Sequence, residues 1–170
     1  MSVRFRIVST IAGNIMYKKI LVPVDGSPAS TLGLDEAIRL AKDQGAELRL
    51  LHVLNEWLAI SPDASGAAAG AVIEGLRDSG NAVLDEADAR ARRGGVTANT
   101  VLLEQIGVPV GAVILKHGEE WGADLIVCGT HGRRGVRRMV MGSDAEYIVR
   151  HTRVPVLLVR QSEEPPKEQC

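Results

Sequence analysis

Five short apolar segments separated by longer helical patterns constrain the fold of this chain more than any other feature. The segments are nearly continuous runs of Val, Ile and Leu, as strands are when helices cover both faces of a sheet. Between them, apolar residues recur at helical spacing, Leu34, Ala37 and Ile38 among them. This alternation predicts an α/β protein with a doubly wound, five-stranded parallel sheet. The expected strands cover residues 19–24, 46–53, 97–105, 123–129 and 154–160.

Local signals set the bounds of the expected helices. Ser27 and Pro28 suit the cap and the first residue of the first helix, and Gly45 suits its end. Small residues and glycines over 55–71 predict a loop, so the second helix is expected from about Val72 to Arg93. Two further helices are expected over 109–121 and over 143–151, the last with Ala145, Ile148 and Val149 facing inward.

The chain of 170 residues suits one domain with extensions at both ends. Residues 1–15 are predicted to be an N-terminal extension, because their apolar run is short, is broken by polar residues and precedes no signal-peptide cleavage site. The domain is expected over 16–160. Residues 161–170 are polar, contain two prolines and are predicted to form a flexible tail.

Composition argues against several classes of partner. A net charge of -1 provides no overall basic field for nucleic acid or for an acidic membrane. Aromatic residues are 3% of the chain, which leaves few platforms for base stacking. No apolar run approaches the roughly 18 residues of a membrane span. Cys128 and Cys170 lie far apart without metal or redox spacing, which favours a reducing, cytoplasmic setting.

Two strand ends carry the richest polar chemistry, VDGS after the first strand and CGTHG after the fourth. In open parallel sheets, ligands bind at the carboxyl ends of strands where the strand order reverses. Gly129 and Gly132 permit close backbone approach and positive φ. The helix expected to start at Gly142-Ser143 offers N–H groups and a positive dipole end, and the Ser143 hydroxyl can cap that helix or donate to a phosphate oxygen. Together these features predict an anion cradle, although neither the P-loop nor the dinucleotide fingerprint occurs.

The spacing Gly129-x2-Gly132-x9-Gly142-Ser143 resembles the ATP-binding signature of universal stress proteins. The segments KKILVPVDGSPAS and AEYIVRHTRVPVLLVR also resemble that family, so the resemblance covers residues 17–160. It implies the sheet order 3-2-1-4-5 of an adenine nucleotide α-hydrolase-like fold. It also implies an ATP-binding protein that acts as a nucleotide-dependent regulator or in the stress response. A divalent ion, Mg²⁺ or Mn²⁺, would be held through the phosphates.

The same resemblance implies which residues meet the nucleoside. Pro23, Val24 and Asp25 would contact the adenosine, with Asp25 near the ribose or the adenine. Val53 would offer its backbone to the adenine. The backbone at Gly129 would run beside the ribose.

For the phosphates, the resemblance implies a set of loop and helix residues. His131 and Gly132 would lie beside them. Asp144 departs from the small or apolar residue that is more usual in the family, because its carboxylate suits a helix N-terminus but repels phosphate if it turns inward. The phosphates would be held by the Ser143 hydroxyl and by the backbone N–H groups of Gly142, Ser143, Asp144 and Ala145.

Other interpretations of these residues stay open. Asp25 also suits a turn in the sequence D-G-S, and His131 suits either a loop position or slow ATP hydrolysis. The arginines at 133, 134, 137 and 138 suit a solvated loop surface, with phosphate contact second. Residues 129–153 hold six arginines against Asp144 and Glu146, a net of +4, so a nucleic-acid-associated protein is the alternative from another class.

The last expected strand predicts a partner. Val154 to Val159 is apolar on both faces and, in the implied order, lies at the edge of the sheet. An exposed apolar edge strand tends to aggregate unless it is paired or covered. We therefore expect a homodimer joined through this strand.

Overall fold

A five-stranded parallel sheet organises the protein in a computed structural model, which describes residues 17–55, 66–105, 107–130 and 141–160. The strand order is β3-β2-β1-β4-β5, which confirms the predicted class and order. All four pairings are parallel. The strands are β1 (Lys19–Pro23), β2 (Glu47–Asn55), β3 (Ala98–Gln105), β4 (Leu125–Gly129) and β5 (Val156–Val159).

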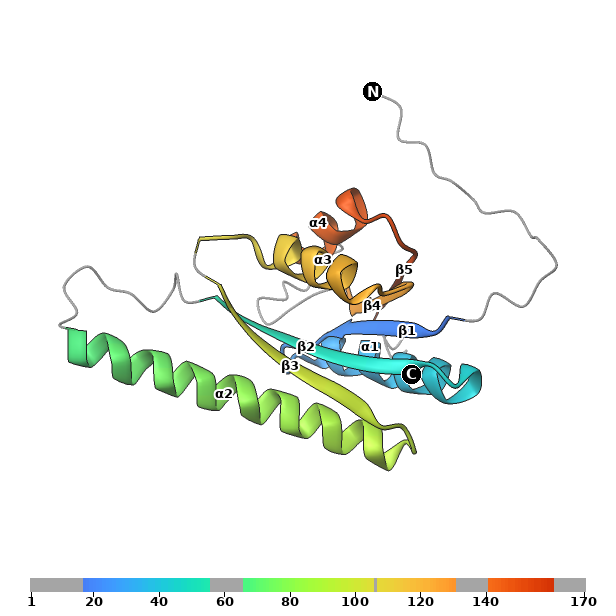
Figure 1. Ribbon diagram of the computed structural model, residues 1–170, viewed down its shortest axis with the longest axis horizontal. Helices are drawn as coiled ribbons and strands as arrows, with labels where there is room; N and C mark the ends of the chain where they lie inside the picture. Colours follow the sequence, from blue (N-terminus) through green and yellow to red (C-terminus); the bar gives the residue numbers. More distant parts are fainter. Residues whose placement is uncertain (1–16, 56–65, 106, 131–140, 161–170) are drawn as a thin grey trace, which may run out of the picture.

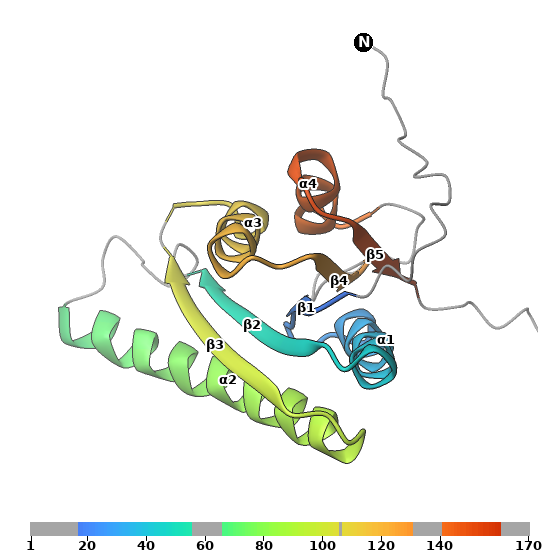
Figure 2. The same ribbon diagram turned by 45° about the vertical axis from the view of Figure 1, so that its right-hand side comes forward.

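Two helices cover each face of the sheet (Figure 1). Helices α1 (Pro28–Gln44) and α2 (Gly66–Arg93) lie on one face, and α3 (Val110–Trp121) and α4 (Ser143–His151) lie on the other, as the turned view in Figure 2 also shows. Within the described ranges, no helix is long and apolar enough to cross a membrane.

The central strand β1 shows why its residues are apolar in an unbroken run. Ile20 and Val22 point into the cluster under α1 and α2, whereas Leu21 points into the cluster under α3 and α4. All three are fully buried. Successive side chains of a strand alternate between faces, so a strand covered on both faces needs an apolar residue at every position.

Helix α1 begins and ends where the sequence predicts. The Ser27 Oγ accepts a hydrogen bond of 3.1 Å from the Ser30 N–H, which satisfies one of the free donors of the first turn. Pro28 is the first helical residue. Gly45 adopts the left-handed conformation with φ of 66°, and its N–H bonds to the Ala41 carbonyl, which ends the helix.

Strands β4 and β5 start two residues later than predicted, and two other bounds are also wrong. Helix α2 starts at Gly66 rather than at about Val72, because the alanines at 67–69 have the highest helix propensity and outweigh the glycines that suggested a loop. Strand β2 continues to Asn55 rather than ending near Val53, because its last residues pair with Glu104 and Gln105 of β3. The difference in β2 depends on a neighbouring strand, which its local pattern does not contain.

Helix α4 also departs from the predicted inward face. Ala145 and Ile148 are buried as expected, but Val149 is 41% exposed. The helix packs on α3 through Tyr147, whose Cβ would lie 2.9 Å from a Cβ added at Gly111. That contact turns the buried stripe toward Tyr147 and leaves Val149 on the solvent side.

A cation–aromatic cluster closes the amino edge of the sheet. The Arg49 guanidinium lies 4.3 Å from the centre of the Trp121 ring, and the Lys19 ammonium lies 5.4 Å from it. Arg49 also lies 3.3 Å from His117 Nε2. Because a guanidinium only donates, Nε2 accepts in this contact. Partial burial and then the charge of Arg49 lower the pKa of His117, while Glu120 opposes the shift.

We expect this histidine to make the protein less stable in mild acid. The unfolded chain takes up the proton near its ordinary pKa of about 6.5, before the folded chain does, so stability falls as the pH drops from there through the lowered folded value. His117→Gln keeps an acceptor for Arg49 but does not titrate. Urea unfolding at about pH 7.5 and about pH 5 should show a smaller loss for the variant, and equal losses would contradict the assignment.

Candidate functional site at the carboxyl edge of the sheet

Three neighbouring strands bring the predicted nucleoside contacts to one edge. Pro23 ends β1, Val24 and Asp25 follow it, and Gly129 ends the adjacent β4. Val53 lies near the end of β2, on the other side of β1. The Val24 N–H donates to the Leu51 carbonyl at 2.9 Å, so the ladder between β1 and β2 continues past the last residue of β1. These residues therefore meet where the strand order reverses.

The turn after β1 is held by its own side chains. Asp25 Oδ1 accepts a hydrogen bond of 2.9 Å from the Ser27 N–H, two residues on, as an aspartate does in an Asx turn. Gly26 between them has a positive φ of 77°. The Asp25 N–H donates to the Ser30 Oγ at 3.2 Å. The turn interpretation of Asp25 is thus correct at the level of the fold, and any ligand contact is additional to it.

Gly129 is a glycine because α1 lies directly against it. A Cβ at this position would sit 2.5 Å from the carbonyl carbon and oxygen of Ala29. From the helix side, a Cβ at Gly33 would sit 3.1 Å from the Gly129 nitrogen. Gly129 does not have the positive φ that the sequence suggested. The absence of a side chain here therefore serves the contact of α1 with β4.

The start of α4 is tied to the end of β4. The Gly142 N–H donates to the Thr130 carbonyl at 2.9 Å, and the Thr130 N–H donates to the Val159 carbonyl of β5 at 3.0 Å. Thr130 and Gly142 therefore lie together at this edge of the sheet. His131 and Gly132, and the arginines at 133, 134, 137 and 138, fall outside the described residues.

The first turn of α4 presents backbone donors rather than a side-chain cap. Gly142 is the N-cap and receives the first helical bond from the Glu146 N–H at 2.9 Å. Ser143 is the first helical residue, so its hydroxyl does not cap the helix, and donation to a phosphate oxygen stays a prediction. Ser143 and Asp144 are exposed, and Ala145 is buried. The N–H groups of this first turn have no carbonyl acceptor within the helix, and the dipole makes this end positive.

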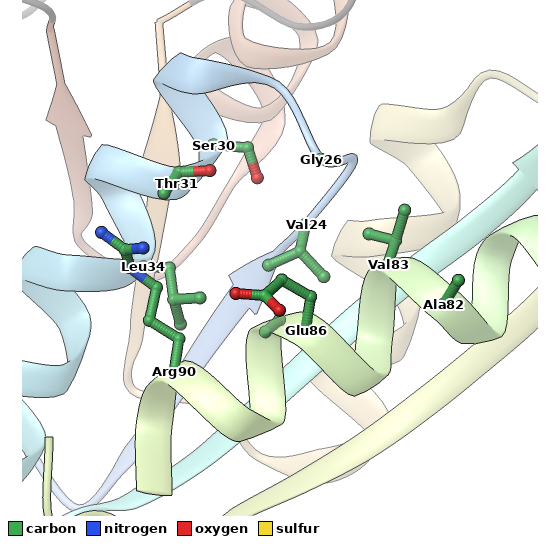
Figure 3. Close-up of a pocket in the computed structure, with 10 residues that line it drawn as sticks. Val24, Gly26, Ser30, Thr31, Leu34, Ala82, Val83, Glu86 and Arg90 are labelled. Carbon is green, nitrogen blue, oxygen red and sulfur yellow. The ribbon is translucent and has the colours of Figure 1, made fainter. Parts of the chain in front are cut away.

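A cavity of about 330 Å³ lies between α1 and α2, beside the turn after β1 (Figure 3). It contains Val24 of the predicted site, but Leu34 and Val83 supply much of its apolar wall. Its charged groups have partners of their own. Arg90 donates to both carboxylate oxygens of Asp35 at 2.5 and 2.8 Å, and Glu86 pairs with Arg93 at 3.0 Å. The cavity therefore adjoins the predicted site from the α2 side.

Two residues that the sequence did not assign to this site contact the turn that follows β1. Ser30 accepts from the Asp25 N–H. His52, which is 6% exposed, places Nδ1 2.6 Å from the Val24 carbonyl oxygen. A histidine among the buried leucines of β2 is the signal that the sequence holds, because buried polar groups require a hydrogen-bond partner.

Comparison with known proteins gives the family. The sequence model of the Universal stress protein family matches residues 16–160. The universal stress protein MJ0531 of Methanocaldococcus jannaschii is 35% identical over 152 residues, which cover 88% of this chain and 85% of that protein. The chain belongs to the universal stress protein family.

Solved structures show the same fold. A structure from the universal stress protein family of Burkholderia pseudomallei is 32% identical with a TM-score of 0.67, covering 86% of this chain and 98% of that chain. A universal stress protein in complex with cAMP is 24% identical with a TM-score of 0.60, covering 86% and 99%. The Archaeoglobus fulgidus protein in complex with dAMP is 23% identical with a TM-score of 0.59, covering 85% and 99%.

We expect Gly129→Ala to destabilise the fold by about 1–3 kcal/mol, the usual cost of forcing extra atoms into a packed site. The matched control is Gly75→Ala in α2, where an added Cβ meets nothing within 4 Å. That change should stabilise the protein by about 0.5–1 kcal/mol, because alanine loses less entropy in a helix. Chemical unfolding measures both. A neutral effect of Gly129→Ala would show that α1 does not hold this close contact in solution.

Proposed function

We propose that this protein binds an adenine nucleotide, ATP, at the carboxyl edge of its sheet and acts as a nucleotide-dependent regulator in the stress response. The observation that carries the proposal is the hydrogen bond from the Gly142 N–H to the Thr130 carbonyl, because it sets the positive end of α4 at the end of β4, the strand next to β1. Related structures with cAMP and dAMP support the choice of an adenine nucleotide.

In this proposal the two halves of the nucleotide meet different parts of the edge. The adenosine lies against Pro23, Val24 and Asp25, with Val53 beside the adenine and Gly129 beside the ribose. The phosphates accept from the first turn of α4, where the donors belong to the backbone. The exposed position of Asp144 supports this arrangement, because its carboxylate is solvated. The phosphate-binding set is His131, Gly132, Gly142, Ser143, Asp144 and Ala145.

The proposed divalent ion, Mg²⁺ or Mn²⁺, is held through the phosphates. Over the described ranges, no group of three His, Cys, Asp or Glu side chains is placed to bind a metal. In nucleotide sites Mg²⁺ is usually bound by phosphate oxygens and water, and the protein supplies only one or two ligands. In this proposal the metal enters with the nucleotide.

The proposed role is regulation by binding in the cytoplasm. A ligand shifts a conformational or partner equilibrium only if it binds the two states unequally. Slow ATP hydrolysis is the alternative, and steady-state phosphate release that disappears in His131→Ala would identify it. The arginine-based nucleic-acid alternative gains no support from Arg150, whose guanidinium pairs with Glu146 at 2.6 Å.

We expect Ser143→Asp to weaken binding of ATP while leaving binding of adenosine nearly unchanged. An acidic residue in the first helical turn suits the dipole, so the fold should keep its stability. The same charge stands close to the proposed phosphates and should lower ATP affinity at least about fivefold. Calorimetric titration with ATP, AMP and adenosine measures the difference.

Ser143→Asn is the matched control, because it has the same size and no charge. The proposal fails if Ser143→Asp binds ATP as tightly as the wild type does. It also fails if freshly purified protein releases no adenine nucleotide on denaturation and gives no heat with ATP. Release of AMP or ADP instead would correct the nucleotide while keeping the site.

The homodimer is proposed to form through β5. Its residues Val156 to Val159 are all half-buried in the single chain, so both faces of this edge strand retain exposed apolar area. Leu157 and Val159 pack on the α1 side and Val156 packs on the α3 side. Pairing with a second copy would cover the edge.

We expect a dimer by light scattering at roughly tens of micromolar and a monomer for Leu158→Asp. Leu158 is half-buried and lies outside both core clusters of the described residues, so its replacement should spare the single chain. Leu158→Val is the apolar control and should stay dimeric. A monomeric wild-type protein, or a dimeric Leu158→Asp variant with unchanged affinity, would refute the interface.

A further inference from the structure

The peptide group between Val24 and Asp25 is held at both ends by side chains from other elements. On one side, its carbonyl oxygen lies 2.6 Å from His52 Nδ1 in β2. On the other side, its N–H donates to the Ser30 Oγ in α1 at 3.2 Å. Because a carbonyl oxygen only accepts, His52 Nδ1 carries the hydrogen in this contact. The two bonds fix the plane of the peptide that carries Asp25.

The His52 ring is itself fixed by packing. The residue is 6% exposed and its Cδ2 would lie 3.0 Å from a Cβ added at Gly80 of α2. The even-numbered neighbours Leu50 and Leu54 are buried as well, and Leu50 belongs to the cluster under α1 and α2. The ring therefore reaches the turn from beneath α2, from within the core.

The bond to His52 falls at the point where strand pairing gives way to the turn. Val24 donates its N–H to the Leu51 carbonyl, the last ladder bond on this side of β1. The next polar group along the backbone is the Val24 carbonyl, which accepts a hydrogen bond from the His52 side chain instead of from a strand. A buried carbonyl without a donor costs free energy, so the histidine sets the direction in which the chain leaves the sheet.

We propose that His52 is a positioning residue of the nucleotide site, whose Nδ1–H fixes the Val24–Asp25 peptide while Ser30 holds its opposite end. The inference rests on the proposed function for its ligand, and on the two hydrogen bonds for its geometry. His52 acts through Val24. Its loss lets the peptide rotate, and the groups of Val24 and Asp25 then no longer face the adenosine in one fixed orientation.

Matched substitutions separate this role from packing. His52→Asn places an amide N–H near the position of Nδ1, whereas His52→Gln places it near the position of Nε2 and preserves more of the volume. Ser30→Ala removes the other end of the clamp without touching the ring. Thermal unfolding confirms that each variant is folded before it is compared.

The first readout needs no nucleotide. Long-range proton–nitrogen correlation should find hydrogen on Nδ1 of His52 in the wild type. Exchange of the Asp25 amide should be at least about fivefold faster in His52→Gln and in Ser30→Ala, and close to wild type in His52→Asn. An Nδ1 without hydrogen, or unchanged Asp25 exchange in both His52→Gln and Ser30→Ala, overturns the clamp.

The second readout is affinity for ATP and for adenosine. Both should fall at least about fivefold in His52→Gln and recover in His52→Asn, because the clamp acts on the adenosine half of the site. Unchanged affinity in folded His52→Gln and Ser30→Ala overturns the positioning role and leaves the proposed function intact. A wild-type protein that binds neither ligand overturns the proposed function, and the exchange measurement still decides the clamp.

Discussion

The first turn of α1 lies against the end of β4 with no room for a side chain between them, and the polar edge of the sheet is built around that contact. The contact requires Gly129 and sets where Ala29 and Ser30 lie. Ser30 then serves twice, because its N–H donates to the Ser27 cap and its hydroxyl accepts from Asp25. Helix packing, helix capping and turn conformation are therefore coupled through a few backbone atoms.

Much of the fold could be predicted because its signals are local. The strands are unbroken apolar runs, and the ends of α1 are marked by Ser27, Pro28 and Gly45, each of which satisfies a specific backbone requirement. The end of β2 and the outward side of α4 could not be predicted in this way. Pairing with β3 extends β2, and the exposure of Val149 depends on how α4 meets α3.

The candidate site shows a different division between what is predictable and what is not. Glycine spacing predicts that backbone comes close to something at 129, but it does not distinguish a ligand from a helix, and here the helix accounts for it. His52 and Val24 are 28 residues apart, and their contact follows from the register of β1 with β2. Only the three-dimensional pairing shows that a core histidine supports an edge turn.

Cys128 illustrates what deep burial beside this edge means for reactivity. The residue precedes Gly129, is 6% exposed, and burial raises the pKa of its thiol to about 12. At neutral pH very little thiolate exists, and the thiolate is the form that oxidants and alkylating reagents attack. Modification of this sulfur therefore has to wait until the core around β4 opens. The rate at which Cys128 is modified, measured by mass spectrometry of the intact protein, therefore reports how often the core opens.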